Sequence, residues 1–416
     1  MDVVMVANSP GEIAGWVAPV VARLKARSRE LRAFLFIPPC PFAAGTEKEV
    51  AKDIFGLDLV ISPKGYLLYT IFKRRPRDFN PSEKGVVVHL GGDFFHSAFL
   101  SRRLKFPAIA YTDRSCGFVD SFQLFLAEDE RVAEKISRKG APPSKIVVVG
   151  SLMADAVQLG LERESALSGS ELQRFERAQL RICLLPGSRP QQVRYMTPFF
   201  LKVAEIIKKV EGGAEFSLIL SPFATLEALR DSVEGARKSR FIEGTCGRLT
   251  TEDGHTLITT GEGLSVSIVT ERRYTAMSIS DLALVMPGTA ASELGFLGVP
   301  MVVAVPLNRP SEIPLPGLVG LLGGLPIAGG VIKGYAVRRL PGKIEFAAMP
   351  NKKARRHIVP EVWGVLRPED IAIKALELLQ DTPRREAMSR DLRESMGAGG
   401  TADRVVDAIF QIAAGS

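Results

Sequence analysis

The chain has 416 residues, 46% of them hydrophobic and 24% charged, with a formal net charge of +8 and an isoelectric point near 9.3. This length fits two domains, and no apolar run reaches the roughly 18 residues of a spanning helix. The basic charge predicts anionic partners. Because no nucleic-acid-binding motif stands out, lipid headgroups and nucleotide phosphates are better candidates than nucleic acid.

Cysteine and histidine usage argues against a metal site. Four cysteines and four histidines are scattered, without C-x-x-C spacing, which disfavours a zinc site or a disulfide framework and favours a reducing cytoplasm. Asp2 opposes a basic leader, and the first apolar run ends at Ala7, so we expect no signal peptide. We expect neither a metal nor another cofactor.

The chain begins with the pattern of a Rossmann-like α/β domain. Apolar residues from Val3 to Ala7 predict a buried strand, residues 8–15 a loop that contains Gly11 and Glu12, and a helix follows from about Trp16 to Ala26. In such domains the loop after the first strand faces a ligand. The loop lacks a G-x-G-x-x-G pattern, which disfavours a dinucleotide as that ligand.

Residues 64–80 combine apolar and basic side chains. Six apolar or aromatic residues precede four cations: Tyr66, Leu67, Leu68, Tyr69, Ile71 and Phe72, then Lys73, Arg74, Arg75 and Arg77. One interpretation is a core helix with a solvated basic end. The other is a membrane-surface element, with apolar side chains in the headgroup zone and cations on anionic lipid.

Asp93 and His96 follow the strand expected at residues 86–90. Gly91 and Gly92 precede Asp93, so its carboxylate would lie past the carboxyl end of a strand, where α/β folds carry catalytic groups. The alternative is a turn aspartate that caps the next helix. Further strands complete a parallel sheet in a first domain at residues 1–165, and these are expected at residues 108–111, 123–127 and 146–149.

A strand, a tight turn and a long helix occupy residues 182–210. The strand ends in Pro-Gly-Ser-Arg, and the charged residues 160–180 before it are expected to be the linker. Gly187 lets the backbone approach a ligand, the amides at Ser188 and the helix start attract anions, and Arg189 adds a fork of donors. The alternative is an ordinary strand-to-helix turn with a surface arginine.

A second turn of the same kind follows the strand expected at residues 282–285. Gly288 forms the turn, Thr289 can cap the next helix, Ala290 lies in its first turn and Glu293 lies one turn inside. In one interpretation the helix start holds a diphosphate and Glu293 accepts two ribose hydroxyls. In the other, Thr289 and Glu293 are a plain capping pair.

The remaining segments complete a second domain at residues 180–385 and helices within 386–416. Residues 241–275 carry period-two patterns that predict hairpin strands at 256–260 and 264–269. The Gly-, Pro- and Leu-rich residues 306–335 would line an acyl chain or pack in a core. Lys352 to His357 form a basic run, which is either solvated or a phosphate or headgroup contact.

These motifs together resemble lipid-A-disaccharide synthase. LLPGSR at 184–189 and PGTAASE at 287–293 are similar to that family's L-L-P-G-S-R and S-G-T-A-x-x-E, in the same order. Five other elements of the family are matched more weakly. In the C-terminal half, Ala348–Asn351 is similar to S-L-P-N and Val359–Glu361 to V-x-E. In the N-terminal half, Gly150–Asp155 is similar to G-H-x-x-x-D, Asp93-Phe94 to part of P-D-F-N, and Pro10–Glu12 to part of G-E-x-S-G-D. The chain departs from the family at Thr112–Cys116, where the family has S-x-W-A-W, and at 241–275, where it has a short link.

The resemblance implies a type-B glycosyltransferase fold, with two Rossmann-like domains facing each other across a cleft. It implies inverting transfer of an acylated glucosamine from UDP, held by the C-terminal domain, to an acylated glucosamine phosphate held by the N-terminal domain. Asp93 would be the general base and His96 an orienting group beside it. Asn351, Glu361, Gly11 and Glu12 would join the two glycine turns in substrate binding.

The resemblance also implies a cytoplasmic enzyme that is peripheral on the inner face of the plasma membrane. A helix start and Arg189 would stabilise the leaving UDP without a metal. The alternatives are another UDP-sugar enzyme on this scaffold, either an epimerase or a glycosyltransferase with a different lipid acceptor, and a non-catalytic nucleotide-sugar-binding protein. The sequence leaves a homodimer open.

Overall fold

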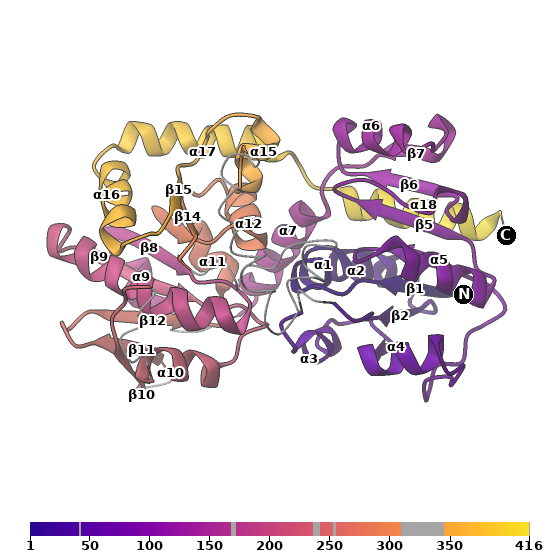
Figure 1. Ribbon diagram of the computed structural model, residues 1–416, viewed down its shortest axis with the longest axis horizontal. Helices are drawn as coiled ribbons and strands as arrows, with labels where there is room; N and C mark the ends of the chain where they lie inside the picture. Colours follow the sequence, from indigo (N-terminus) through magenta and orange to yellow (C-terminus); the bar gives the residue numbers. More distant parts are fainter. Residues whose placement is uncertain (41–42, 168–171, 236–241, 253–254, 309–344, 416) are drawn as a thin grey trace, which may run out of the picture. The chain divides into compact units, whose positions relative to one another are not determined.

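The computed structural model describes residues 1–40, 43–167, 172–235, 242–252, 255–308 and 345–415, and these form two compact α/β units (Figure 1). Unit 1 contains residues 1–159 and 397–416, and unit 2 contains residues 160–396. Each unit has one sheet with a Rossmann-like strand order. The predicted fold class of two Rossmann-like α/β domains is therefore confirmed.

Unit 1 has a seven-stranded sheet in which all strand pairs are parallel. From edge to edge the strands are β3 (Leu59–Ile61), β2 (Arg32–Phe36), β1 (Asp2–Val6), β4 (Gly85–His89), β5 (Ala108–Thr112), β6 (Leu124–Ala127) and β7 (Ile146–Val148). The order reverses between β1 and β4, which makes the carboxyl ends of these two strands the switch point where α/β sheets bind ligands.

The first helix of unit 1 begins earlier than expected. It starts at Pro10, with α1 (Pro10–Glu12), a π-helical turn (Ile13–Val17) and α2 (Ala18–Arg27), so Gly11 and Glu12 lie in a helix and not in a loop. Ser9 has extended backbone angles and Pro10 occupies the first helical position, where its missing N–H costs nothing. The carboxylate of Glu12 also accepts the Ser9 amide at 3.1 Å.

The other helices of unit 1 cover its sheet. They are α3 (Glu47–Lys52), α4 (Pro63–Thr70), α5 (Phe94–Leu104), α6 (Glu130–Arg138) and two 3-10 turns, Val119–Ser121 and Pro143–Lys145. The last helix, α18 (Thr401–Ala414), returns to unit 1 and packs against α2 (Figure 1). Asp155 anchors this return, because its carboxylate accepts the amides of Gly400 and Thr401 at 2.8 and 2.9 Å.

Unit 2 has an eight-stranded sheet. From edge to edge the strands are β10 (Gly247–Glu252), β11 (His255–Thr260), β12 (Ser265–Val269), β9 (Ala214–Ile219), β8 (Leu180–Leu185), β13 (Leu282–Val285), β14 (Met301–Pro306) and β15 (Glu361–Gly364). The strand order reverses between β8 and β13. The predicted hairpin between β11 and β12 is confirmed, but β12 also pairs in parallel with β9 and belongs to the central sheet. Among the described residues of 241–275, only β10 and β11 are therefore an antiparallel addition to its edge.

The helices of unit 2 are α8 (Gln173–Glu176), α9 (Pro190–Val210), α10 (Leu226–Glu234), α11 (Arg273–Ser278), α12 (Thr289–Leu297), α15 (Met349–Ala354), α16 (Pro368–Leu379) and α17 (Thr382–Met396). Helix α7 (Leu152–Ser165) runs from unit 1 into unit 2, so the first part of the linker expected at residues 160–180 is helical. The helical pattern of α7 was missed because the segment carries many charged residues. One of these, Glu164, is buried and accepts two amides of the first turn of α11.

Both cores form around central strands that are apolar without alternation. All residues of β1, β4, β5 and β13 are buried, as expected for parallel strands covered on both faces by helices. No helix in the described ranges has both the length and the apolar character needed to cross a bilayer. From residue 309 on, the Gly-, Pro- and Leu-rich segment lies outside the described residues.

Candidate functional site

The two glycine turns of unit 2 lie next to each other at its switch point. Strands β8 and β13 pair in parallel with Leu185 opposite Val285, and these are the last residues of the two strands. Gly187 and Gly288 follow two and three residues later. The sheet therefore brings together two turns that are about 100 residues apart in sequence and that share the same strand–glycine–helix pattern.

The first turn is closed by a side chain that the sequence analysis missed. Gly187 has a φ of +114°, and a Cβ there would lie 2.6 Å from Oε1 of Gln192. This oxygen accepts the amides of Ser188 and Arg189, both at 3.3 Å, and Arg189 is the N-cap of α9. An anion that used these amides would replace the Gln192 carbonyl. Gln192 lies three residues after the N-cap, and this spacing of a glutamine is the sequence signal that could have revealed the contact.

The second turn has no described neighbour close to Gly288. Gly288 has a φ of +146°, and a Cβ there would meet no atom of the described residues within 4 Å. The structure corrects the expected cap, because Gly288 and not Thr289 is the N-cap of α12. Thr289 and Ala290 are its first two residues and are half-buried. The first amides of α12 thus have no side-chain cap among the described residues.

Glu293 lies inside unit 2 and already has two partners. Its side chain is buried, Oε1 accepts the Tyr274 hydroxyl at 3.0 Å, and Oε2 lies 3.8 Å from the Arg273 guanidinium. Burial raises the pKa of Glu293, while Arg273 and the Tyr274 hydroxyl act in the opposite direction. No local pattern in the sequence points to Arg273 and Tyr274, because only the packing of α11 on α12 brings them to Glu293.

Glu164 of α7 holds the start of helix α11 through hydrogen bonds. The Glu164 carboxylate accepts the amides of Tyr274 and Thr275 at 3.0 and 2.7 Å, and also the Thr275 hydroxyl at 2.9 Å. A Cβ on Gly160 would lie 2.2 Å from the Tyr274 ring, so the glycine lets this ring pack closely on α7. Tyr274 is therefore held at both its backbone and its ring, which orients its hydroxyl toward Glu293.

Asn351 and Glu361, both expected to bind substrate, bind each other. The Asn351 side-chain amide donates to the Val359 carbonyl at 2.9 Å and to Glu361 Oε1 at 2.8 Å, and its oxygen accepts the Ile358 and Val359 amides. Glu361 also accepts the amides of residues 347 and 348 and the Trp363 indole N–H. These contacts connect the start of α15 to β15, so the structure supports a scaffolding role for both residues.

In unit 1, Glu12 joins the two loops of the switch point. Its carboxylate accepts the Asn8 and Ser9 amides at 3.0 and 3.1 Å and the Gly92 amide at 3.1 Å. A Cβ on Gly91, whose φ is +142°, would lie 2.1 Å from Glu12 Cδ, so only glycine fits there. Burial raises the pKa of Glu12, while the three backbone amides and Arg114 oppose this shift. Gly11 lies beside it in the first turn of α1.

Asp93 is exposed and caps α5. Its Oδ1 accepts the Phe95 amide at 2.8 Å, as the structural alternative predicted. This bond orients the carboxylate at the carboxyl edge of the sheet. The residue before it, Gly92, donates its amide to Glu12. His96 lies one turn into α5 and is half-buried, with Nδ1 2.7 Å from the Tyr66 hydroxyl. Capping and catalysis are compatible, because Oδ2 is not used by this cap.

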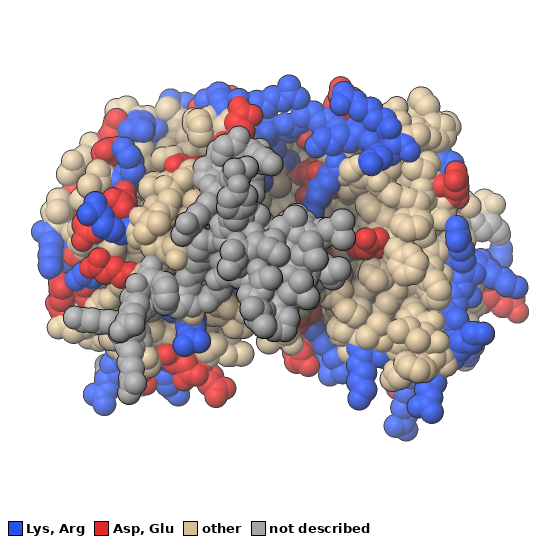
Figure 2. Space-filling model, viewed as in Figure 1, with Lys and Arg blue, Asp and Glu red and all other residues tan. Residues whose placement is uncertain are grey.

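The apolar residues of α4 and the segment after it differ in burial, although they form one group in the sequence. Tyr66 and Tyr69 are buried in the core of unit 1, while Leu67, Ile71 and Phe72 are 39%, 64% and 66% exposed. Lys73, Arg74, Arg75 and Arg77 are all exposed. Figure 2 shows basic side chains beside uncharged surface along the lower edge of unit 1, where Figure 1 places α4. The buried tyrosines agree with the core-helix interpretation, and the exposed apolar and basic side chains leave the membrane-surface interpretation as a prediction.

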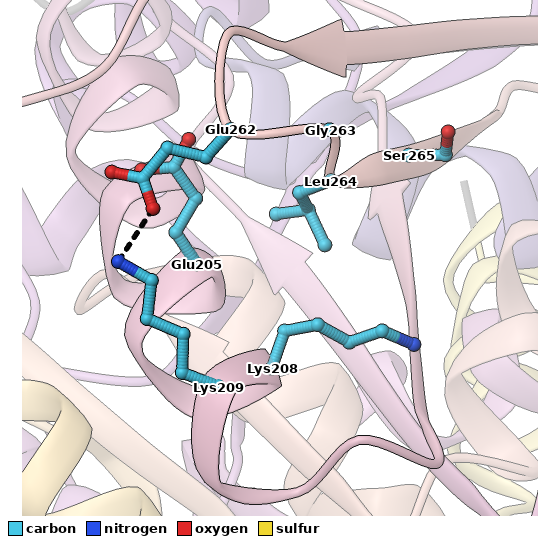
Figure 3. A pocket seen from close by; sticks show the side chains of 7 residues that line it. All are labelled: Glu205, Lys208, Lys209, Glu262, Gly263, Leu264 and Ser265. Carbon is cyan, nitrogen blue, oxygen red and sulfur yellow. Dashed lines mark ion pairs between the residues drawn. The ribbon is translucent and has the colours of Figure 1, made fainter.

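A cavity of about 170 Å³ lies elsewhere in unit 2 (Figure 3). It is lined by the end of α9 and the turn between β11 and β12: Glu205, Lys208, Lys209, Glu262, Gly263, Leu264 and Ser265. Ion pairs of 2.8 and 2.6 Å link Glu262 to Lys202 and Lys209. The cavity is at the opposite end of α9 from the glycine turn, so it is not the candidate site. Across the described residues, no three His, Cys, Asp or Glu side chains form a metal-binding group.

Comparisons with known proteins agree with the motifs. The chain is 28% identical over 235 residues to a lipid-A-disaccharide synthase of Anaeromyxobacter sp. (strain K), covering 56% of this chain and 49% of the relative. It is 26% identical over 285 residues to one of Prochlorococcus marinus, covering 67% of this chain and 60% of the relative. The chain is related in sequence to lipid-A-disaccharide synthases. It spans about half the length of the first of these relatives, and no family model matches it.

Solved structures support the fold alone. A UDP-GlcNAc 2-epimerase from Neisseria meningitidis, bound to UDP-GlcNAc, has a TM-score of 0.61 at 14% identity, covering 99% of this chain and 100% of that chain. A UDP-GlcNAc 2-epimerase from Methanocaldococcus jannaschii has a TM-score of 0.54 at 13% identity, with the same coverage. The two Rossmann-like units are thus of the type-B glycosyltransferase class that the sequence predicted.

Proposed function

We propose that the protein is an inverting UDP-sugar-dependent glycosyltransferase. It transfers an acylated glucosamine from UDP to the hydroxyl of an acylated glucosamine phosphate. The observation that carries the proposal is the pair of glycine turns, PGSR and PGT, at one switch point with Glu293 one turn inside the second helix. The relatives named lipid-A-disaccharide synthase carry the choice of reaction.

Unit 2 supplies the donor site in this proposal. The N-termini of α9 and α12 direct backbone amides and the positive ends of their helix dipoles toward the switch point. Arg189 adds a guanidinium that stays charged at any physiological pH. These groups stabilise the charge that develops on UDP as the sugar leaves. Glu293 accepts hydroxyls of the ribose, and Tyr274 and Arg273 hold its carboxylate in place.

Unit 1 supplies the acceptor site and the general base. The attacking hydroxyl is a poor nucleophile at neutral pH, and a carboxylate that takes its proton speeds the attack. Asp93 suits this role because it is exposed and fixed by its Phe95 bond. Glu12 keeps the preceding backbone in place through the Gly92 amide. The proton moves from the hydroxyl to Asp93 as the new C–O bond forms and UDP leaves with the electrons of the old one.

In this proposal, Leu67 on α4 and the following Ile71 and Phe72 dock the enzyme on the cytoplasmic surface of the plasma membrane. Three exposed apolar side chains next to four cations match the pattern of a peripheral element on anionic lipid. Such docking gives access to an acylated acceptor without extracting it from the bilayer. We therefore assign the protein to lipid A biosynthesis as a peripheral membrane enzyme.

Product analysis by mass spectrometry tests the proposal. The full-length protein is incubated with a panel of UDP-sugars, acylated and unacylated, together with extracted anionic lipids. The proposal predicts release of UDP and a lipid product whose mass increases by one acylated glucosamine. An isomerised UDP-sugar without lipid product would identify an epimerase. Bound UDP-sugar without any conversion would identify a binding protein, and either result would contradict the proposal.

A further inference from the structure

A tyrosine and a histidine from different helices meet beside Asp93. The Tyr66 hydroxyl, on α4, lies 2.7 Å from Nδ1 of His96, on α5. The two rings are nearly perpendicular, at 89°, with centroids 5.2 Å apart. Tyr66 is only 3% exposed, so a hydrogen-bond partner inside the protein is important for its hydroxyl.

The number of hydrogens decides which partner donates. A phenol has one O–H to donate, and a neutral imidazole has one N–H and one lone pair. Within the described residues, Nδ1 of His96 is the sole hydrogen-bond partner of the Tyr66 hydroxyl. If Nδ1 carried the hydrogen, the buried O–H would lack an acceptor, which is costly. Tyr66 therefore donates to Nδ1, and the hydrogen of the neutral ring is on Nε2.

The surroundings keep these groups neutral. Burial lowers the pKa of His96, and the charge of Asp93 only partly offsets this effect. Burial also lowers the pKa of the neighbouring His89 to about 3, and His89 Nδ1 lies 2.8 Å from the Ser97 hydroxyl. Burial raises the pKa of Tyr66 to about 12, so its hydroxyl keeps its proton.

We propose that Tyr66 is a positioning residue that fixes His96 as a hydrogen-bond donor through Nε2, and that His96 thereby holds an oxygen of the acceptor beside Asp93. A ring nitrogen that already carries a hydrogen does not accept another proton, so the proton of the attacking hydroxyl goes to Asp93. His96 exchanges no proton in the reaction. The identity of the acceptor rests on the proposed function, whereas the tautomer does not.

Nuclear magnetic resonance tests the tautomer directly. Long-range ¹H–¹⁵N spectra of the full-length protein labelled in histidine at pH 7 report which ring nitrogen is protonated. The chain has only four histidines, and a His96→Gln variant assigns the signal. We expect a neutral His96 with its hydrogen on Nε2. A hydrogen on Nδ1, or a charged ring, in the wild-type protein would overturn the proposal.

Two tyrosine variants test the role of the hydroxyl. Tyr66→Phe should give His96 a mixture of tautomers, because the donor to Nδ1 is lost. Tyr69→Phe is the matched control, since Tyr69 is also buried on α4 but packs its ring on Phe36 and Phe79. It should leave the His96 signal unchanged. An unchanged signal in folded Tyr66→Phe would contradict the positioning role.

Turnover tests the donor role. The glutamine of His96→Gln keeps an N–H donor near the place of Nε2 but is not a base. We expect His96→Gln to keep kcat/KM for the acceptor within about 10-fold, and His96→Ala to lose more than that through KM for the acceptor. Equal inactivity of both variants would show that His96 acts as a base. If the wild-type protein transfers no sugar, the proposed function fails while the resonance test still decides the tautomer.

Discussion

Replacing Glu293 should weaken UDP binding, and the structure separates two contributions: the contact of the carboxylate with the ribose and the orientation of the carboxylate by Tyr274. In Glu293→Ala the ribose hydroxyls lose a charged acceptor, which costs about 1.5–3 kcal/mol, or roughly 10- to 150-fold in Kd. Tyr274 and Arg273 also lose the partner that lies 3.0 and 3.8 Å away. Tyr274→Phe removes only the hydroxyl that orients the carboxylate, so its effect on Kd should be smaller, about 10-fold or less.

Titration calorimetry with UDP measures both variants against the wild-type protein. Glu262→Ala is the matched control, because Glu262 is also an ion-paired carboxylate of unit 2 but lies at the remote cavity (Figure 3). It should leave the UDP affinity unchanged. Circular dichroism confirms that each variant is folded. A folded Glu293→Ala variant with wild-type UDP affinity, or an equal loss in Glu262→Ala, would refute the assignment of the donor site.

Three further predictions concern other parts of the molecule. Arg189→Ala should weaken UDP binding by about 1–3 kcal/mol in the same titration, and an unchanged Kd would remove Arg189 from the site. Arg74→Glu combined with Arg75→Glu should lose at least about 2 kcal/mol of binding to anionic vesicles in a sedimentation assay, since each of the two cations contributes about 1 kcal/mol. Vesicle binding that is unchanged in this variant and unaffected by salt would contradict docking through α4. Burial raises the pKa of Glu12 above its ordinary 4.5. Between pH 4.5 and the higher pKa of the folded state, Glu12 keeps a proton in the folded state that it loses in the unfolded state, so stability falls as pH rises. Glu12→Gln should flatten this part of the curve of Tm against pH, and parallel curves for variant and wild type would show that Glu12 does not titrate there.

The strands and the two glycine turns could be predicted because their signals are local. Central parallel strands are buried on both faces, so the centres of these strands are short apolar runs: 3–6 in β1, 86–88 in β4, 182–185 in β8 and 282–285 in β13. The strand–glycine–helix pattern also fixes where each turn lies in the sheet. The same logic led to Asp93, which directly follows a strand and two glycines and whose catalytic role stays a prediction.

The partners of the site residues could not be predicted, because they depend on packing between distant segments. Tyr274 reaches Glu293, and Tyr66 reaches His96, only after helices have packed on the sheet. The early start of α1 was missed because Gly11 and Gly15 weaken a helical pattern, while the Glu12 contact that stabilises it involves Gly92. Strand β12 was placed in an insertion because alternation is typical of hairpins, although the strand lies beside β9.

The measurement that most directly tests the account is the turnover of Asp93→Asn. This change keeps the shape of the side chain and its ability to accept the Phe95 amide, but removes the basicity of the carboxylate. The account predicts a fall in kcat of about 100- to 10,000-fold with UDP affinity near that of the wild-type protein. Near-normal turnover of Asp93→Asn would contradict the assignment of the general base, and a loss of turnover confined to His96→Ala would transfer that role to His96.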